Sequence, residues 1–150
     1  MSAEFSANAA QVVPANSSVI FTETPVLCNC GLVYHRDGSG IFRLANRFAR
    51  QNIMNCWRRN SNYLVSFHAN IAIPTGGTAE EISLAVAIDG EVDPSSTMII
   101  VPAAIGDFGN VGAEVIVTVP SVCLCSSVSI RNTSNQAITV QNANLVIDRA

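Results

Sequence analysis

The stretch "GLVYHRDGSGIFRL", residues 31–44, decides the fold. Its histidine, two arginines, aspartate and Gly-Ser-Gly turn are residue types of a catalytic or phosphate-binding loop, and equally of a β-hairpin. Residues 32–35 and 41–44 alternate as two short strands, and the glycines of residues 37–40 can adopt positive φ in the turn between them. No helix start follows the glycines to hold a phosphate. The stretch therefore predicts a hairpin.

Alternation continues along most of the chain. In "NYLVSFHANIAI", residues 62–73, the odd-numbered residues are apolar, whereas Ser66, His68 and Asn70 fall on the other face. "EISLAVAIDGE", residues 81–91, repeats the pattern and ends in an Asp-Gly turn. Further strands are expected at residues 19–22, 98–101, 111–119, 122–130 and 138–147. We predict one all-β domain over residues 1–150, a jelly-roll β-sandwich of about ten antiparallel strands.

The composition predicts a protein that hides apolar surface in a subunit interface. Charged residues make up 13% of the chain and hydrophobic residues 49%, whereas an average soluble domain is roughly 25% charged. The net charge of -3 gives no reason to expect nucleic acid or an anionic membrane as a partner. The longest apolar run, residues 98–105, is far shorter than the roughly 20 residues of a membrane span. The N-terminus lacks the features of a signal peptide, so we expect synthesis in the cytoplasm.

The basic residues are all arginine, and six of the eight lie between residues 36 and 59. Guanidinium groups suit interfaces, because they are weakly hydrated and form forked hydrogen bonds with carboxylates. A solvated face, an inter-subunit salt-bridge belt and an anion-binding face all remain open. The candidate ligand or docking face consists of Arg47, Arg50, Trp57, Arg58 and Arg59.

Five cysteines could provide cross-linking thiols. Their C-x-C spacing suits zinc poorly, and an odd count argues against a closed disulfide framework. Reduced cysteines filling an interface are favoured, with disulfides and a metal site as alternatives. We expect no cofactor. The cysteines are Cys28, Cys30, Cys56, Cys123 and Cys125.

Two other groups of residues are candidates for chemistry. Asp89, Glu91 and Asp93 could hold calcium, although alternating acids in a hairpin are usually solvated. His35 and His68 are the only histidines, and neither belongs to a G-x-S-x-G or H-E-x-x-H motif. We therefore expect structural histidines and a protein that is not an enzyme.

The order of the strand signatures resembles the C1q and tumour-necrosis-factor superfamily of trimeric jelly rolls. The chain opens with "EFSA" and continues with "VIFTETPVLCNCG", the hairpin "YHRDGSGIF" and "YLVSF". It closes with "NANLVIDRA", whose polar ending is unlike the animal proteins, as is the Arg-rich insert at residues 45–60. Short stand-alone proteins of gut Firmicutes and their phages are similar in character.

The resemblance implies a homotrimer with no enzymatic activity, whose three-fold axis would be lined by Tyr63, Phe67 and Phe108. We expect it to be attached to a larger particle, as a phage capsid decoration or fibre-head protein, with residues 1–10 as an attachment arm. Its partner would be a capsid or other surface-layer protein, and its mature location the virion or the cell or spore surface. The alternative is a glycan-binding or surface-adhesion module that uses Trp57, Asn60 and Asn62.

Overall fold

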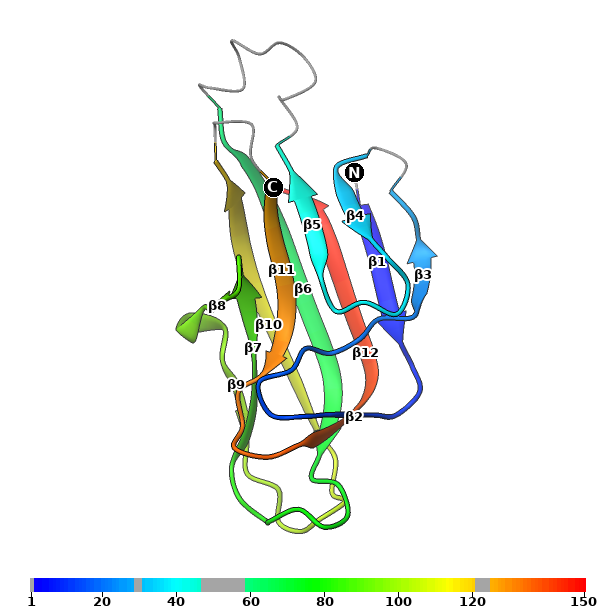
Figure 1. Cartoon of the computed structure of the whole chain (residues 1–150), viewed down its shortest axis with the longest axis vertical. Helices are drawn as coiled ribbons and strands as arrows, with labels where there is room; N and C mark the ends of the chain where they lie inside the picture. Colours follow the sequence, from blue (N-terminus) through cyan, green and yellow to red (C-terminus); the bar gives the residue numbers. More distant parts are fainter. Residues whose placement is uncertain (1, 29–30, 47–58, 121–124) are drawn as a thin grey trace.

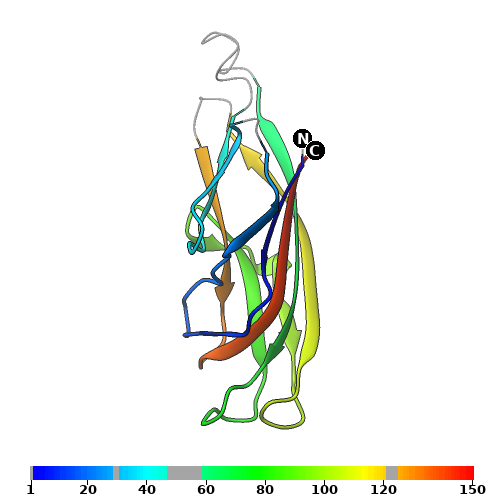
Figure 2. The same ribbon diagram turned by 90° about the vertical axis from the view of Figure 1, so that its right-hand side faces the viewer.

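The structure, a computed structural model, describes residues 2–28, 31–46, 59–120 and 125–150. Two antiparallel sheets pack face to face, as the two views in Figure 1 and Figure 2 show. The elements are β1 Ser2–Ala7, β2 Gln11–Val13, β3 Glu23–Val26, β4 Val33–His35, β5 Phe42–Ala45, β6 Ser61–Ala72, β7 Ile82–Ile88, β8 Glu91–Val92, the 3-10 helix η1 Pro94–Ser96, β9 Met98–Ile100, β10 Gly109–Val119, β11 Cys125–Asn132 and β12 Ile138–Arg149.

The strands divide evenly between the sheets. Sheet A has the order β10-β6-β12-β1-β3, with β2 paired to β12, and sheet B has the order β4-β5-β11-β7-β8, with β9 paired to β7. The all-β sandwich predicted from the alternation is therefore confirmed. No helix of the described ranges is long and apolar enough to span a bilayer.

Strand β6 lies between β10 and β12 in sheet A and follows the predicted period of two. It pairs with β10 along one edge and with β12 along the other. Tyr63, Val65 and Phe67 point into the space between the sheets and are buried, whereas His68 on the opposite face is exposed. Because one face is buried and the other is not, this strand fixes which side of sheet A is inside.

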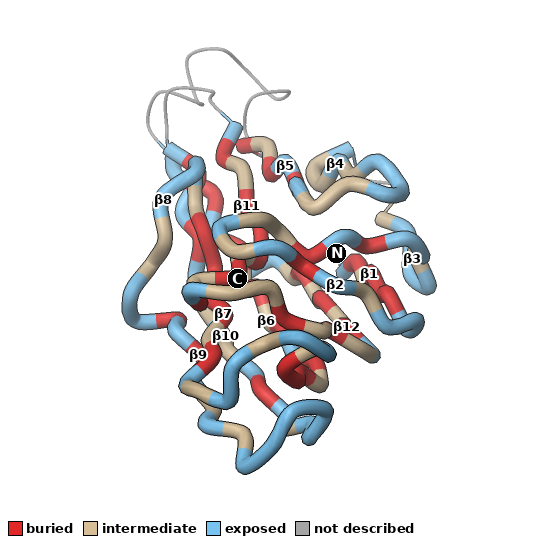
Figure 3. Tube along the Cα trace, turned by 60° about the horizontal axis from the view of Figure 1, so that its bottom comes forward, coloured by how far each residue is buried: buried red, intermediate tan, exposed pale blue. Residues whose placement is uncertain are grey.

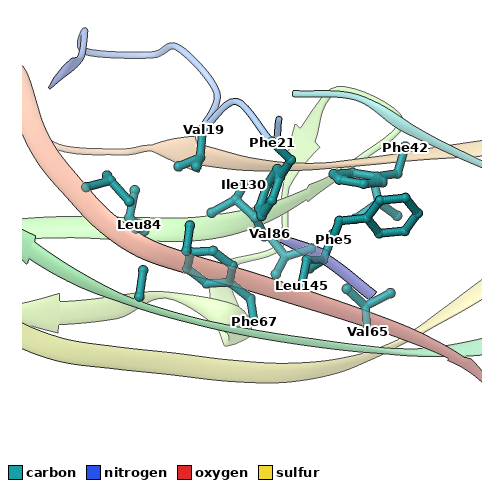
Figure 4. Close-up of a cluster of buried hydrophobic side chains, with 14 of the residues drawn as sticks. Phe5, Val19, Phe21, Phe42, Val65, Phe67, Leu84, Val86, Ile130 and Leu145 are labelled. Atoms are coloured by element: carbon teal, nitrogen blue, oxygen red, sulfur yellow. The ribbon is translucent and has the colours of Figure 1, made fainter. Parts of the chain in front are cut away.

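Aromatic side chains from both sheets meet in the core (Figure 4). Phe21 contacts Phe42 edge-on with ring centroids 5.2 Å apart, and Phe5 contacts Phe42 in the same way at 4.7 Å. Phe21 and Val19 are fully buried, but the strand expected at residues 19–22 does not form. This segment makes only isolated bridges, such as the one between Phe21 and Ser39.

The hairpin predicted at residues 31–44 is confirmed. His35 lies opposite Phe42, and Gly38 has a φ of +85°. Gly40 is needed for a different reason, because an added Cβ would lie 2.7 Å from the carbonyl oxygen of Val19. The ring of His35 stacks on Phe42 at 4.2 Å, so this side chain packs against the core and not on the outside.

The N-terminal segment is part of sheet A. Strand β1 lies between β12 and β3, and Phe5 is buried in the core. Ser2 is opposite Asp148, so the two ends of the chain lie side by side (Figure 2). Residues 2–7 are thus built into the sandwich as β1, and the use of residues 1–10 as an attachment arm stays a prediction.

The outer surface of sheet B is partly covered. Ala85 and Ala87 of β7 point away from the core and are nevertheless buried, next to the 3-10 helix η1. The amide of Val86 donates a hydrogen bond to Ser96 Oγ at 2.8 Å. Figure 3 shows how the buried residues run along the strands while the connections remain exposed. Sheet A has no such cover among the described segments.

Candidate functional site

The outer surface of sheet A, called the open face below, has no described segment packed over it. Figure 2 shows no described segment on the side of sheet A that faces away from sheet B. The open face is built from the residues that alternate with the core positions, such as Leu64, Ser66 and His68 on β6. It is therefore the natural place to look for a partner.

Three apolar side chains gather near the upper end of the open face, in the orientation of Figure 1. Ile116 on β10 lies directly opposite Leu64 on β6, and Val146 lies on the adjacent strand β12. Leu64 and Val146 are half-buried, whereas Ile116 is 55% exposed. Among the described strands, β10 is at the edge of sheet A and pairs only with β6 there. We call Leu64, Ile116 and Val146 the apolar patch.

Carboxylates surround the apolar patch and are held by neutral donors. Ser66 Oγ donates to Glu114 Oε1 at 2.8 Å, and Asn144 Nδ2 donates to Glu4 Oε1 at 2.7 Å. At the upper end, Ser2 Oγ donates to Asp148 Oδ1 at 3.1 Å. These hydrogen bonds join neighbouring strands across the surface. The open face therefore combines an apolar centre with fixed polar surroundings.

Two adjoining hollows lie at the lower end of sheet A, with volumes of about 420 and 460 Å³. Both are lined by Val12, Pro74 and Thr75. The first continues onto the open face through Ala72, Thr139 and Phe108, and the second runs along residues 76–78 and 136–137. Volumes of this size are in the range of small-ligand sites.

The residues expected at the three-fold axis do not lie together. Tyr63 and Phe67 belong to the core of one protomer, and the Tyr63 hydroxyl donates to the carbonyl of Ala45. Neither side chain can reach a second subunit, because sheet B covers both, and the expectation does not hold for them. Phe108 is 49% exposed and lines the first hollow. Leu64 and Ile116 were missed, although the same alternation assigns them to the opposite face from Tyr63.

Most of the Arg-rich candidate face lies outside the described residues, namely Arg47, Arg50, Trp57 and Arg58. Arg59 is described and exposed, and its carbonyl accepts a hydrogen bond from Asn46 Nδ2 at 2.9 Å. The use of this face as a docking surface stays a prediction.

The described cysteines differ from one another. Cys28 is disulfide-bonded, so the expectation of reduced cysteines does not hold for it. Cys125 is a free, exposed thiol. The other three, Cys30, Cys56 and Cys123, lie outside the described residues.

The acidic turn at residues 89–93 uses its carboxylates locally. Asp89 accepts a hydrogen bond from the amide of Ser127 at 2.9 Å and has a φ of 52°, as the predicted two-residue turn requires. Asp93 caps η1 by accepting from the amide of Ser95 at 3.0 Å. Across the described residues, no three His, Cys, Asp or Glu side chains are grouped so that they could hold a metal ion.

The two histidines lie on different sheets, His35 on β4 of sheet B and His68 on β6 of sheet A. His35 Nε2 lies 2.9 Å from the carbonyl oxygen of Ser39, and its Nδ1 is buried with no partner among the described residues. His68 is exposed on the open face, opposite Gly112 of β10 and Asn144 of β12. The first histidine has a packing role, and the second is a surface group of sheet A.

No sequence family matches the chain, and no curated protein is significantly similar to it in sequence. Solved structures are similar in fold. The globular domain of zebrafish complement 1qA has a TM-score of 0.63 and 11% identity, over 98% of this chain and 94% of that one. The TNF-family protein Eiger from S. frugiperda has a TM-score of 0.65 and 9% identity, over 100% and 92%. Murine APRIL has a TM-score of 0.61 and 6% identity, over 99% of each chain.

These similarities extend over nearly the whole of each chain, at identities that carry information on fold alone. They agree with the order of strand signatures in the sequence and with the two-sheet topology. The chain therefore has the jelly-roll fold of the C1q and TNF globular domains, a fold that is generally non-catalytic.

Proposed function

We propose that the protein is a non-enzymatic structural module that acts as a homotrimer, with the apolar patch of the open face packed against a second copy of the chain. C1q/TNF-like folds usually form homotrimers. The observation that carries the proposal is that Leu64, Ile116 and Val146 lie together on an otherwise uncovered sheet face. Burying these apolar side chains against a second copy removes them from water, which stabilises the assembled state.

Two further features support a second copy as the occupant. Only 13% of the residues are charged, which fits a chain that buries additional surface on assembly. The edge strand β10 carries a single charged residue, Glu114, and Ile116 stands on it. A long and nearly uncharged edge is normally protected by a partner.

Light scattering tests the homotrimer. We expect a mass of about 48 kDa at micromolar concentration, three times the chain mass of 15.9 kDa. A single species with the chain mass under the same conditions would overturn the proposal. A dimer would also overturn it.

The larger context is proposed from the sequence resemblance to phage proteins. The trimer would decorate a phage capsid or form a fibre head, bound to a capsid or other surface-layer protein and exposed on the virion. Stoichiometric co-sedimentation with virions of a phage that encodes the protein would support this role. Recovery only in the unassembled fraction of a lysate would contradict it.

The alternative, glycan binding through Trp57, concerns a residue outside the described part of the chain. Loss of glycan-array binding in Trp57→Ala would support it. The described structure offers a different location for a sugar.

A further inference from the structure

We propose that the lower half of the open face is a binding site for a neutral oligosaccharide. The site combines an exposed aromatic ring, a small buried residue beside it, free hydroxyl groups and a row of side-chain amides. It is separate from the apolar patch, and its residues are Asn70, Ala72, Phe108, Asn110, Thr139 and Asn142.

The shape of the first hollow follows from the register of the strands. Thr139 is paired with Ala72 on one side and with Val12 on the other. Phe108 immediately precedes β10, whose first residue is opposite Ile71. The small side chain of Ala72 thus lies between two larger ones, Phe108 and Val12, which stand on either side of the hollow. The result is a trough with an aromatic wall.

An amide row lies one strand repeat above this trough. Asn110 Nδ2 donates to Asn70 Oδ1 at 3.1 Å, and Asn70 Nδ2 donates to Asn142 Oδ1 at 3.3 Å. Residues two apart on a strand share a face and are about 7 Å apart, so Ala72 lies directly below Asn70 on β6. Phe108 comes two residues before Asn110, next to the start of β10. The Asn142 Nδ2 and Asn110 Oδ1 atoms make no hydrogen bond with any described residue, so both are available to a ligand.

The third amide owes its position to a β-bulge. The pairing of β12 with β6 shifts between Gln141 and Asn144, where β12 has one extra residue. Asn142 occupies the bulge with a φ of 53°, a conformation that asparagine tolerates better than most residues. A regular strand would place only every second residue on this face. The bulge instead adds Asn142 next to Gln141, within hydrogen-bonding distance of Asn70.

The chemistry of the lining selects the class of ligand. None of the residues that line the two hollows is charged. The hydroxyls of Thr75 and Thr139 form no hydrogen bonds within the described ranges. Sugar rings present an apolar C–H face, which stacks on an aromatic ring, and hydroxyl groups, which pair with amides and hydroxyls. A neutral oligosaccharide matches both kinds of group, whereas an anionic ligand would find no cation there.

The walls of the hollows are held in place without a ligand. Two hydrogen bonds join Gln136 and Thr78. The Thr78 amide donates to Gln136 Oε1 at 2.9 Å, and Gln136 Nε2 donates to the Thr78 carbonyl at 2.7 Å. The amide of Gly106 donates to the carbonyl of Ile73 at 3.0 Å. These contacts fix the connections before and after the long strands of sheet A. A preformed site loses less conformational freedom on binding.

The test is binding of the whole protein to an array of neutral oligosaccharides, followed by calorimetric titration with the best-bound one. We expect saturable binding that weakens about tenfold in Phe108→Ala and about threefold to tenfold in Asn110→Ala. Phe108→Trp should keep the affinity, because it keeps an aromatic face.

Two variants serve as matched controls. Tyr34→Ala removes another exposed aromatic side chain, 66% exposed, from sheet B. Thr118→Ala removes an exposed, hydrogen-bonded hydroxyl group from the upper end of the open face. Both should bind the sugar as the natural chain does. Circular dichroism and light scattering check that all variants stay folded and keep their oligomeric state.

Each remaining outcome would overturn the proposal. Absence of binding to every neutral oligosaccharide on the array excludes the site, and binding that Phe108→Ala leaves unchanged places the sugar elsewhere. If the natural chain binds no sugar and Phe108→Ala dissociates the oligomer, the trough holds a second copy of the chain. Because mass and sugar binding are measured separately, failure of this site and failure of the homotrimer can be told apart.

Discussion

Replacing Ile116 by aspartate should convert the homotrimer into monomers while leaving each protomer folded. Ile116 stands on the edge strand β10 at the outer side of the apolar patch, opposite Leu64. Its side chain points away from the core, so the substitution disturbs no packing between the two sheets.

The size of the effect follows from the exposure of Ile116 in the protomer. Full burial of an isoleucine stabilises by about 1.5–3 kcal/mol, and Ile116 is still 55% exposed before assembly. About 1 kcal/mol per protomer is therefore lost, or about 3 kcal/mol per trimer. An aspartate near Glu114 and Asp148 adds an unpaired charge to the contact, which costs a further several kcal/mol per trimer. A total above about 4 kcal/mol weakens association roughly a thousandfold.

Light scattering across a concentration series measures this change. Ile41→Asp is the matched control, since Ile41 is 58% exposed and lies next to β5 of sheet B. It adds the same charge and should leave the trimer mass unchanged. If Ile116→Asp remains trimeric, or if both variants dissociate equally, the apolar patch is not the contact.

Three further substitutions probe the protomer itself through urea unfolding. Tyr63→Phe removes the hydroxyl that donates to the Ala45 carbonyl and should lower the free energy of unfolding by about 1–3 kcal/mol without changing the oligomeric mass. Dissociation of the oligomer with unchanged stability would instead show that Tyr63 contributes to the subunit interface. Gly40→Ala should destabilise by about 1–3 kcal/mol, because its Cβ would lie 2.7 Å from the backbone oxygen of Val19, and a neutral result would mean that this contact relaxes freely. Asn132→Ala should lower the free energy of unfolding by about 3 kcal/mol or more, since the buried side-chain amide donates to the carbonyls of Val13 and Gln136 and accepts from the amide of Ser134. Asn62→Ala, at an exposed position, should lower it far less.

The fold could be predicted because its strands have one buried and one open face. In β6 this produces alternation between buried Tyr63, Val65 and Phe67 on one side and mostly polar residues on the other, where Leu64 is an exception. The hairpin at residues 31–44 was equally readable, since its turn needs glycine at Gly38. The alternation and the turn glycine each depend on a few neighbouring residues, so both can be recognised in the sequence.

The candidate site was less predictable, because its position depends on which face of a strand meets the other sheet. Tyr63 and Phe67 have the character of interface aromatics, and only the position of sheet B shows that the protomer itself buries them. The bulge at Asn142 is hidden for a similar reason. It becomes visible only in the pairing of β12 with β6, and alternation along "VQNANLVI" does not reveal the extra residue.

Assembly and sugar binding should reinforce each other. A shallow trough bounded by one aromatic ring and a row of amides is suited to weak binding of a single sugar. A trimer carries three such troughs, and binding to a surface with many sugars then gains about 10²–10⁴-fold in avidity. The monomeric Ile116→Asp variant separates the two effects. It should bind the free oligosaccharide as well as the natural chain does and lose most of its retention on a sugar-coated surface, as measured by surface plasmon resonance. Equal retention of trimer and monomer would show that the three sites cannot engage one surface together.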